Sequence, residues 1–246
     1  MERNNILFRC SSLGHIMTEP KLKSETISET AKTHLIDVFI SNVYGRRSDI
    51  GNRYTIKGTL VEEDSMTLFS RVTKRYYVKN EESLANDYIK GTPDIITSLS
   101  VEDMEIIDIK SSWDIFTFMR AKFKNEIKKL YYWQIQGYMA LTGAKSGRLA
   151  YCLVNTPDQL LEDEKRKLWY KIGQPDKESP MWLDAVQEIE MMCIYDDIPM
   201  QERLHQISFE RNDADIERLY ARIEACRKWM DEHLFNVPER IDIERV

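Results

Sequence analysis

The sequence contains few cysteines, and none of them lies near another. They are Cys10, Cys152, Cys193 and Cys226, and no two form a CxxC pair. Zinc sites and iron–sulfur clusters built from neighbouring cysteines need short spacings. We therefore expect no iron–sulfur cluster and no disulfide framework. The prediction is a cytoplasmic protein with reduced thiols.

The chain also lacks long apolar runs and an excess of positive charge. No run approaches the roughly 18 apolar residues that span a membrane, and the N-terminus has no signal-peptide pattern, so we expect no membrane partner. The net charge of −6 does not by itself indicate nucleic-acid binding. The stretch 120–129 is nevertheless basic, and local potential decides whether a polyanion binds.

The spacing of apolar residues predicts both helices and strands. Helices are expected at about 35–45, 54–72, 125–142, 158–171, 181–193 and 213–234. Strands are expected at about 74–80, 87–97, 104–112, 147–155 and 203–210. Short breaks between the first three strands favour hairpins, and the helix before the fourth strand favours a crossover. We therefore predict an α/β fold with a mixed sheet flanked by helices.

One acidic residue and one lysine lie within a strand that is rich in isoleucine. The sequence contains several Asp/Glu-x-Lys triplets, but only Asp108–Lys110 falls inside such a strand. Residues i and i+2 of a strand share a face, so the two side chains point the same way. A buried carboxylate and ammonium are costly unless they pair with each other or hold a metal. Both interpretations stay open from this triplet alone.

A second acid, Asp94, follows Pro93 in the preceding strand-like segment. A hairpin between the two segments would bring Asp94 beside Asp108. Two carboxylates that converge without a cation repel each other, whereas a divalent cation between them turns the pair into a ligand set. The arrangement therefore favours a metal site.

With these motifs in order, the chain resembles the PD-(D/E)xK nuclease superfamily, in particular its lambda-type and YqaJ-like phage recombination exonucleases with RecB-like motifs. The resemblance rests on five stretches in family order: "FRCSSLGHIMT", "KGTLVEE", "GTPD", "DIK" and "WQIQGYMAL". It implies a restriction-endonuclease-like core (αβββαβ) with extra C-terminal helices. Residues 1–246 would form one nuclease domain with its core at about 54–155, a DNA-end-binding segment at about 1–53 and a helical extension at about 156–246.

The resemblance also implies a catalytic site that uses one or two Mg²⁺ or Mn²⁺ ions. Asp94, Asp108 and the carbonyl of Ile109 would hold the metal, with Glu62 helping, although Glu63 is an alternative on the same predicted helix. Lys110 would orient or deprotonate the attacking water, and its pKa should fall beside a metal. Gln134 would orient Lys110 or the water, or else only pack against Tyr138, one helical turn away.

The DNA contacts implied by the resemblance lie in several parts of the chain. An arginine and hydroxyl groups would hold a 5′-phosphate, and the basic stretch and one tyrosine would add contacts. These DNA-binding candidates are Arg9, Ser11, Ser12, Thr92, Tyr138, Lys122 and Lys124. A solvated basic face is the alternative for the lysines. Trp113, Phe116 and Phe118 would either stack on a base at a duplex end or pack in the core.

The activity expected from the resemblance is magnesium-dependent hydrolysis of duplex DNA from its ends, in the 5′-to-3′ direction, in phage-type recombination. A viral protein of this kind would work in the host cytoplasm, with a single-strand annealing protein as a candidate partner and a homo-oligomer as a candidate assembly. The alternatives are an endonuclease or a single-strand or flap nuclease of the same fold. A catalytically inert DNA-binding or interaction module is the third alternative.

Overall fold

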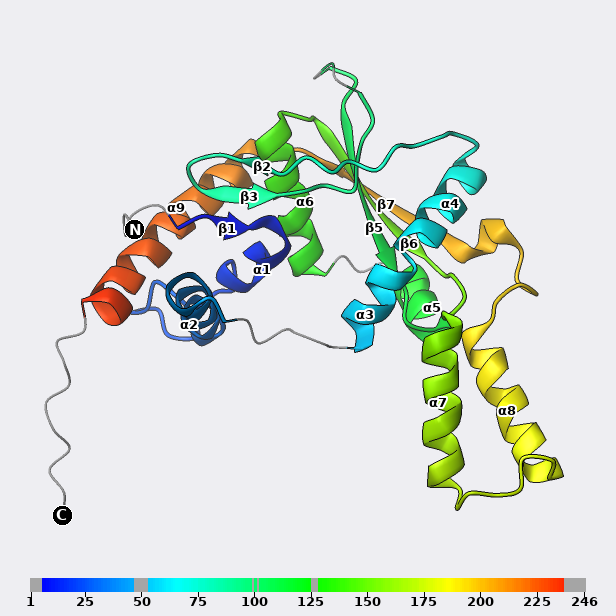
Figure 1. The fold of residues 1–246 in the computed structure, drawn as a ribbon. Coiled ribbons are helices and arrows are strands. Elements are labelled where there is room, and N and C mark those ends of the chain that lie inside the picture. The colour runs from blue at the N-terminus through cyan, green and yellow to red at the C-terminus, as the bar shows by residue number, and fades with distance from the viewer. Residues whose placement is uncertain (1–5, 47–52, 99, 101, 125–127, 237–246) are drawn as a thin grey trace, which may run out of the picture.

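The computed structural model describes residues 6–46, 53–98, 100, 102–124 and 128–236. Its main sheet has four strands in the order β4-β5-β6-β7, and a smaller sheet has the order β1-β3-β2. The strands are β1 (Phe8–Arg9), β2 (Leu84–Ala85), β3 (Ile89–Gly91), β4 (Ile95–Ile96), β5 (Glu105–Ser111), β6 (Ser146–Cys152) and β7 (Leu204–Glu210). Figure 1 shows helices on both sides of the main sheet.

The helices account for most of the described chain. The α-helices are α1 (Leu13–Ile16), α2 (Glu29–Tyr44), α3 (Arg53–Leu60), α4 (Glu62–Thr73), α5 (Ile115–Lys124), α6 (Lys129–Thr142), α7 (Asp158–Lys171), α8 (Pro180–Cys193) and α9 (Asp213–Met230). Short helical turns are η1 (Cys10–Ser12), η2 (Met200–Arg203) and the π-helical turn η3 (Asp231–Phe235). No helix in the described part of the chain combines the length and apolar content that crossing a bilayer requires.

Strand pairing in the main sheet follows the predicted hairpin and crossover. β4 pairs antiparallel with β5, β5 pairs parallel with β6 and β6 pairs antiparallel with β7. The parallel pair requires a crossover connection, and α5 and α6 provide it. The mixed α/β sheet flanked by helices is therefore confirmed.

Alternate side chains of the central strands pack in two different hydrophobic cores. Ile106 and Leu149 join the larger core on the side of α6, whereas Ile107 and Ala150 join a smaller core with Phe69 of α4. Successive strand side chains point to opposite faces, so the two clusters mark the two covered faces of the sheet. A sheet covered on both faces explains the continuous apolar run in β5.

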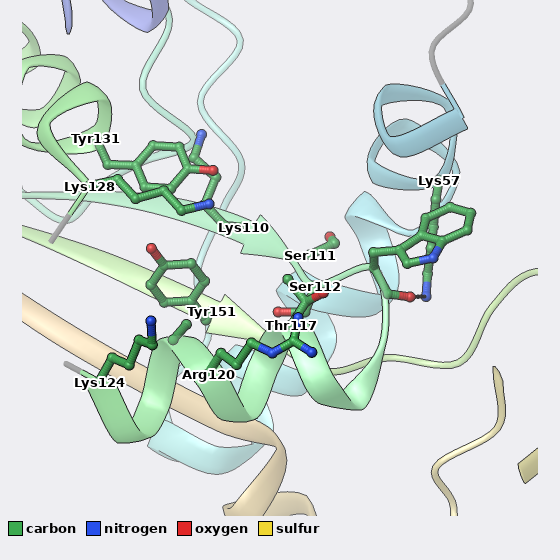
Figure 2. A pocket seen from close by; sticks show the side chains of 12 residues that line it. Lys57, Lys110, Ser111, Ser112, Thr117, Arg120, Lys124, Lys128, Tyr131 and Tyr151 are labelled. Atoms are coloured by element: carbon green, nitrogen blue, oxygen red, sulfur yellow. Dashed lines mark hydrogen bonds between the residues drawn. The ribbon is translucent and has the colours of Figure 1, made fainter. Parts of the chain in front are cut away.

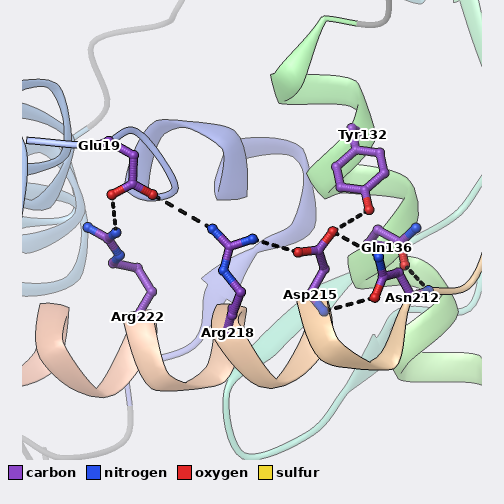
Figure 3. A network of polar contacts seen from close by, with 7 residues as sticks. All are labelled: Glu19, Tyr132, Gln136, Asn212, Asp215, Arg218 and Arg222. Atoms are coloured by element: carbon purple, nitrogen blue, oxygen red, sulfur yellow. Dashed lines mark hydrogen bonds and ion pairs between the residues drawn. The ribbon is translucent and has the colours of Figure 1, made fainter.

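Helix α6 is fixed in place by the C-terminal helix α9. Tyr132 of α6 donates a hydrogen bond to Asp215 (2.5 Å), and the side chain of Gln136 accepts one from the backbone N–H of Asn212 (3.0 Å). The network in Figure 3 continues from Asp215 through Arg218 to Glu19 near the N-terminus. The extension after residue 156 therefore holds the helix that carries Gln134, and its strand β7 completes the sheet.

Most predicted elements are confirmed, with boundaries shifted by a few residues. They include β5, β6, β7, α7, α8 and α9, together with α2 and α6, which end before Gly45 (φ 63°) and Gly143 (φ 81°). A glycine adopts this left-handed conformation at little cost, which makes it a good helix terminator. The predicted start of α6 at 125–127 lies outside the described residues.

Three predictions about the segments around the sheet are wrong. The single helix at 54–72 is two helices, α3 and α4, which meet at Val61. The strand at 87–97 is divided between the two sheets, with Pro93, which cannot donate to a ladder, between β3 and β4. The segment 74–80 forms no strand: Tyr77 packs on Phe69, while Tyr76 is 88% exposed.

Helix α5 was not predicted at all. Its capping signal is present in the sequence, because the Asp114 carboxylate accepts a hydrogen bond from the backbone N–H of Thr117 (2.7 Å). An aspartate at the N-cap whose side chain accepts a hydrogen bond from the N–H three residues later commonly begins a helix. Phe118 of α5 is fully buried and packs in the core, whereas Phe116 is half-exposed.

Candidate active site

The acid and the lysine on β5 form an ion pair. Asp108 is 2% exposed, and its Oδ2 lies 2.8 Å from the Nζ of Lys110. The i, i+2 spacing on a strand places both side chains on one face, as predicted. The structural pairing and the metal-site interpretation therefore both remain compatible with this contact.

The Asp94 carboxylate takes a hydrogen bond from β5 that the backbone of a neighbouring strand would otherwise accept. β4 pairs with β5 only at Ile106 and Ile107, and beyond that point the Asp94 Oδ2 accepts a hydrogen bond from the backbone N–H of Ile109 (2.6 Å). The N–H and C=O of one strand residue point to the same side. The Ile109 carbonyl therefore faces the Asp94 side, where none of the described strands pairs with it.

The two carboxylates influence each other strongly. Burial, followed by repulsion from Asp108 and more weakly from Glu62, raises the pKa of Asp94 to about 7. Burial alone would lower the pKa of Lys110, but Asp108 and then Asp94 outweigh it, so this pKa lies above its usual 10.5. The expected fall in the Lys110 pKa does not occur while Lys110 is the cation that neutralises the two acids. A metal would compete with it for them.

The donor set fits a hard divalent cation. The Oδ2 of Asp108 is buried and accepts no hydrogen bond from the described residues, with only the Lys110 ammonium beside it. Two carboxylates and a backbone carbonyl are oxygen ligands of the kind that magnesium takes. Within the described ranges, no group of three or more His, Cys, Asp or Glu side chains is assembled for a metal, so the acids that converge are Asp94 and Asp108.

Glu62 lies at the edge of this site but points to a different partner. It is the first residue of α4, and its carboxylate lies 2.8 Å from the Nζ of Lys79, with both side chains partly exposed. Its negative charge adds, as the smallest of the contributions, to the raised pKa of Asp94. Glu63 is exposed, and the structure gives no contact between it and the acids. The structure therefore pairs Glu62 with Lys79, a partner that the sequence did not reveal.

Gln134 connects the acids to Tyr138. Its Nε2 donates to Asp108 Oδ1 (2.9 Å) and to the Tyr138 hydroxyl (3.0 Å), and all three residues are buried. The structure thus brings Gln134 to Asp108, and it shows no contact with Lys110, the partner expected from the sequence. Burial also raises the pKa of Tyr138, so the phenol stays protonated and can accept this bond.

Tyr138 leads to a hollow of about 470 Å³, which we call the end hollow. Its lining combines four of the predicted DNA contacts with residues that sequence reasoning missed. The lining residues are Arg9, Cys10, Ser11, Ser83, Lys90, Gly91, Thr92 and Tyr138. The pairing of β1 with β3 joins the N-terminal segment to the Gly-Thr-Pro-Asp stretch. Ser12 does not line it, because its hydroxyl donates to the Arg9 carbonyl (3.0 Å).

A glycine allows the close packing at this end hollow. A Cβ at Gly91 would lie 2.6 Å from the Tyr138 ring and 3.0 Å from Cys10. Any larger residue would therefore displace the tyrosine that carries the hydrogen-bond chain to Asp108. The Gly-Thr-Pro-Asp motif thus has a packing role at its first position.

A second hollow, of about 600 Å³, has Lys110 in its lining, and we call it the basic hollow. Figure 2 shows its walls, α5 on one side and the start of α6 on the other. The lining residues are Lys57, Lys110, Ser111, Ser112, Trp113, Thr117, Arg120, Ala121, Lys124, Lys128, Tyr131 and Tyr151. Lys124, one of the predicted DNA contacts, is among them. Lys122 is not among them; its ammonium faces the Glu202 carbonyl (3.4 Å).

Lys57 opens the quoted KGTLVEE stretch, but sequence reasoning did not single it out, because the partners that hold it are far away in the chain. It is 1% exposed, and its Nζ donates to the Trp113 carbonyl (2.7 Å) and the Thr156 hydroxyl (3.0 Å). Burial lowers its pKa to about 8. Both partners come from distant parts of the chain, and the role of Lys57 is to join α3 to them.

Comparison with solved structures identifies the fold. The chain is similar to a phage-related exonuclease from Haemophilus somnus 129PT, with 25% identity and a TM-score of 0.70, covering 93% of this chain and 95% of that one. It is also similar to the alkaline exonuclease LHK-Exo from Laribacter hongkongensis (14% identity, TM-score 0.62, coverage 93% and 90%). No protein-family model and no curated sequence matches. The restriction-endonuclease-like fold and the resemblance to phage-type PD-(D/E)xK exonucleases are confirmed.

Proposed function

We propose that this chain, which has the fold of the phage-related and alkaline exonucleases, is a metal-dependent DNA exonuclease that degrades duplex ends from 5′ to 3′. The observation that carries the proposal is the convergence of Asp94, Asp108 and the Ile109 backbone beside Lys110. A solved structure of LHK-Exo in complex with dAMP, 16% identical with a TM-score of 0.61, supports a nucleotide ligand for this fold.

Asp94, Asp108 and the Ile109 carbonyl would hold Mg²⁺ or Mn²⁺, and Glu62 would join them or a second ion after leaving Lys79. A bound ion lowers the pKa of water and stabilises negative charge on a phosphate. Gln134 keeps the Asp108 carboxylate oriented through its 2.9 Å hydrogen bond. Lys110, on the same strand face, would orient the attacking water and accept its proton once a metal neutralises the acids.

The end hollow supports action at a 5′ end. Arg9 and Lys90 supply positive charge, and Ser11 and Thr92 supply hydroxyl donors. Charged donors and hydroxyls in one hollow suit a terminal phosphate, which carries more charge than an internal one. Three contacts separate this hollow from Lys110, through Tyr138, Gln134 and Asp108. A gripped 5′-phosphate would therefore place the next phosphodiester beside the acids.

The whole chain would act as one nuclease domain, with residues 1–53 contributing to the grip on the DNA end and the C-terminal extension bracing the core. The cytoplasmic location, the annealing-protein partner and the homo-oligomer stay predictions.

One assay tests the proposal directly. Purified protein is incubated with linear duplex carrying a 5′-phosphate, the same duplex with a 5′-hydroxyl, and a covalently closed circle, with Mg²⁺ or with EDTA. We expect rapid release of mononucleotides only from the phosphorylated linear DNA with Mg²⁺. Arg9→Ala should remove the preference for the phosphorylated end. Degradation of the circle would indicate an endonuclease, and absence of hydrolysis would indicate an inert binding module.

A further inference from the structure

The basic hollow concentrates positive charge in an acidic protein. The chain has a net charge of −6, yet no acidic residue is found among the described residues that line this hollow. The cations come from both walls and from the floor, and they are Lys57, Lys110, Arg120, Lys124 and Lys128. Lys110 is paired with Asp108, whereas Arg120, Lys124 and Lys128 gather without a paired acid among the described residues, so they repel one another and favour a polyanion.

Three of these cations are available to a ligand. Neither an ion pair nor a hydrogen bond joins Arg120, Lys124 or Lys128 to another side chain in the described structure, apart from the position of Lys128 over Tyr131. Lys57, by contrast, is committed to Trp113 and Thr156, and Figure 2 shows it at the far end of the hollow.

On the wall formed by the start of α6, an aromatic ring packs against the cations. The Tyr131 ring carries two ammonium groups, with its centroid 5.2 Å from Lys110 Nζ and 5.7 Å from Lys128 Nζ. The Tyr151 ring meets it edge-on at 6.2 Å. Hydroxyl groups of Ser111, Ser112 and Thr117 lie in the same hollow. Cations interleaved with aromatic rings are the pattern that tracks a nucleic-acid strand.

The position of the hollow relative to the acids defines which part of the DNA it meets. The chain of contacts from the end hollow runs through Tyr138, Gln134 and Asp108 to Lys110, and Lys110 itself lines the basic hollow. The hydrogen bond and the ion pair of Asp108 therefore link the linings of the two hollows. A strand with its 5′-phosphate in the end hollow and its next phosphodiester at the acids would bring its following phosphates to the basic hollow.

We propose that the basic hollow binds the phosphates of the retained strand immediately 3′ of the cleaved bond, through Arg120, Lys124 and Lys128. This inference rests on the proposed 5′-end function. The hollow thus grips the DNA that remains after each cleavage and makes hydrolysis depend on strand length.

The test compares two variants with the same change in charge. Arg120→Gln/Lys124→Gln/Lys128→Gln removes the free cations of the hollow. The control, Lys145→Gln/Lys171→Gln/Lys177→Gln, removes three exposed lysines that line neither hollow and lie outside residues 1–53. Binding of 5′-phosphorylated DNA is measured in EDTA by fluorescence anisotropy over a range of salt concentrations. Each lost phosphate contact lowers the magnitude of the slope of log affinity against log salt by roughly 0.7–0.9. For the hollow variant we therefore expect this slope to fall by about 2, and for the control by less than about 1.

Hydrolysis of short strands gives a second, independent result. A 5′-phosphorylated dinucleotide has no phosphate beyond the bond to be cleaved, so the hollow variant should cleave it at the wild-type rate. The kcat/KM of the wild type should increase as the strand becomes longer. The increase for the hollow variant should be at least tenfold smaller. An equal loss at all lengths would overturn the inference, as would an unchanged salt slope.

Photocrosslinking identifies the strand and separates the two proposals. 5-Iododeoxyuridine placed just 3′ of the cleaved bond should crosslink to Tyr131 or Tyr151. Crosslinks that form only from the complementary strand would overturn the inference. It would also be overturned if a free 5′-mononucleotide inhibited the hollow variant more weakly than the wild type. If the wild-type protein shows no hydrolysis, the proposed function fails, while the salt slopes in EDTA still test the hollow as a strand-binding site.

Discussion

The Asp94 carboxyl should make the metal-free protein less stable as pH rises. Burial, followed by repulsion from Asp108, raises the pKa of Asp94 to about 7, against about 3.9 for an unfolded aspartate. The folded chain therefore binds this proton more tightly than the unfolded chain. The resulting stabilisation is present below about pH 4 and is lost as pH rises to about 7.

The pKa difference sets the size of the effect. It corresponds to an upper limit of about 4 kcal/mol. Asp94 keeps part of its surface in contact with solvent, which screens its charge, so we expect Asp94→Asn to increase the free energy of unfolding at pH 8 by roughly 1–3 kcal/mol. The asparagine oxygen can still accept the hydrogen bond from the Ile109 N–H, so the hairpin contact is preserved.

The assay is urea unfolding in EDTA, followed by circular dichroism between about pH 4 and pH 8, the window in which Asp94 titrates. The difference in unfolding free energy between Asp94→Asn and wild type should grow with pH. Asp184→Asn, at an exposed position of α8, serves as the control and should show no such trend. Mg²⁺ should stabilise the wild type more than Asp94→Asn, because it binds the folded carboxylates. A difference that stays constant with pH would refute the reasoning.

The remaining predictions concern the neighbours of the acids. Lys110→Ala should lower kcat by about 10²- to 10⁴-fold without changing the circular dichroism spectrum, and Lys110→Arg should not restore activity because arginine stays protonated; full activity in either variant would contradict the role of the lysine. Gln134→Leu should lower the free energy of unfolding by about 1.5–3 kcal/mol, since buried Asp108 loses a donor, and calorimetry should show a Tm lower by roughly 3–12 °C. An unchanged Tm would mean that the 2.9 Å bond contributes nothing. Lys79→Met should increase Mg²⁺ affinity in titration calorimetry by up to about fivefold, because an exposed ion pair is worth up to about 1 kcal/mol and Glu62 would become free. A decrease in affinity would show that Lys79 supports the site.

Several features of the site follow from the sequence alone because they depend on short-range geometry. Asp108 and Lys110 share a face since they are two residues apart on a strand. Gln134 and Tyr138 meet since they are four apart on a helix. Periodicity also gave the central strands and the long helices, and glycine marked two helix ends. Local rules of this kind require no knowledge of distant neighbours.

Other sequence predictions failed where the same composition suits more than one structure. Residues 74–80 contain the Tyr and Val residues typical of a strand, but the N–H groups of Lys74 and Arg75 bond back to the end of α4, and the N–H of Asn80 donates to the Asp94 carbonyl (2.8 Å). A strand needs a ladder as well as a propensity. The helix α5 was missed because its amphipathic pattern is short and ends in the basic stretch.

The tertiary structure alone decided how the parts of the site meet. Only the pairing of β1 with β3 brings Arg9 to Thr92, and only the end of β4 leaves room for Asp94 at Ile109. The sequence likewise does not show that Glu62 pairs with Lys79. Nor does it show that Lys124 lines the basic hollow while Lys122 does not. The sequence by itself determined which residues are the candidates for the chemistry, because those patterns are local. Which of them share a site depends on contacts between residues far apart in the chain, and these arise only when the two faces of the sheet are buried together.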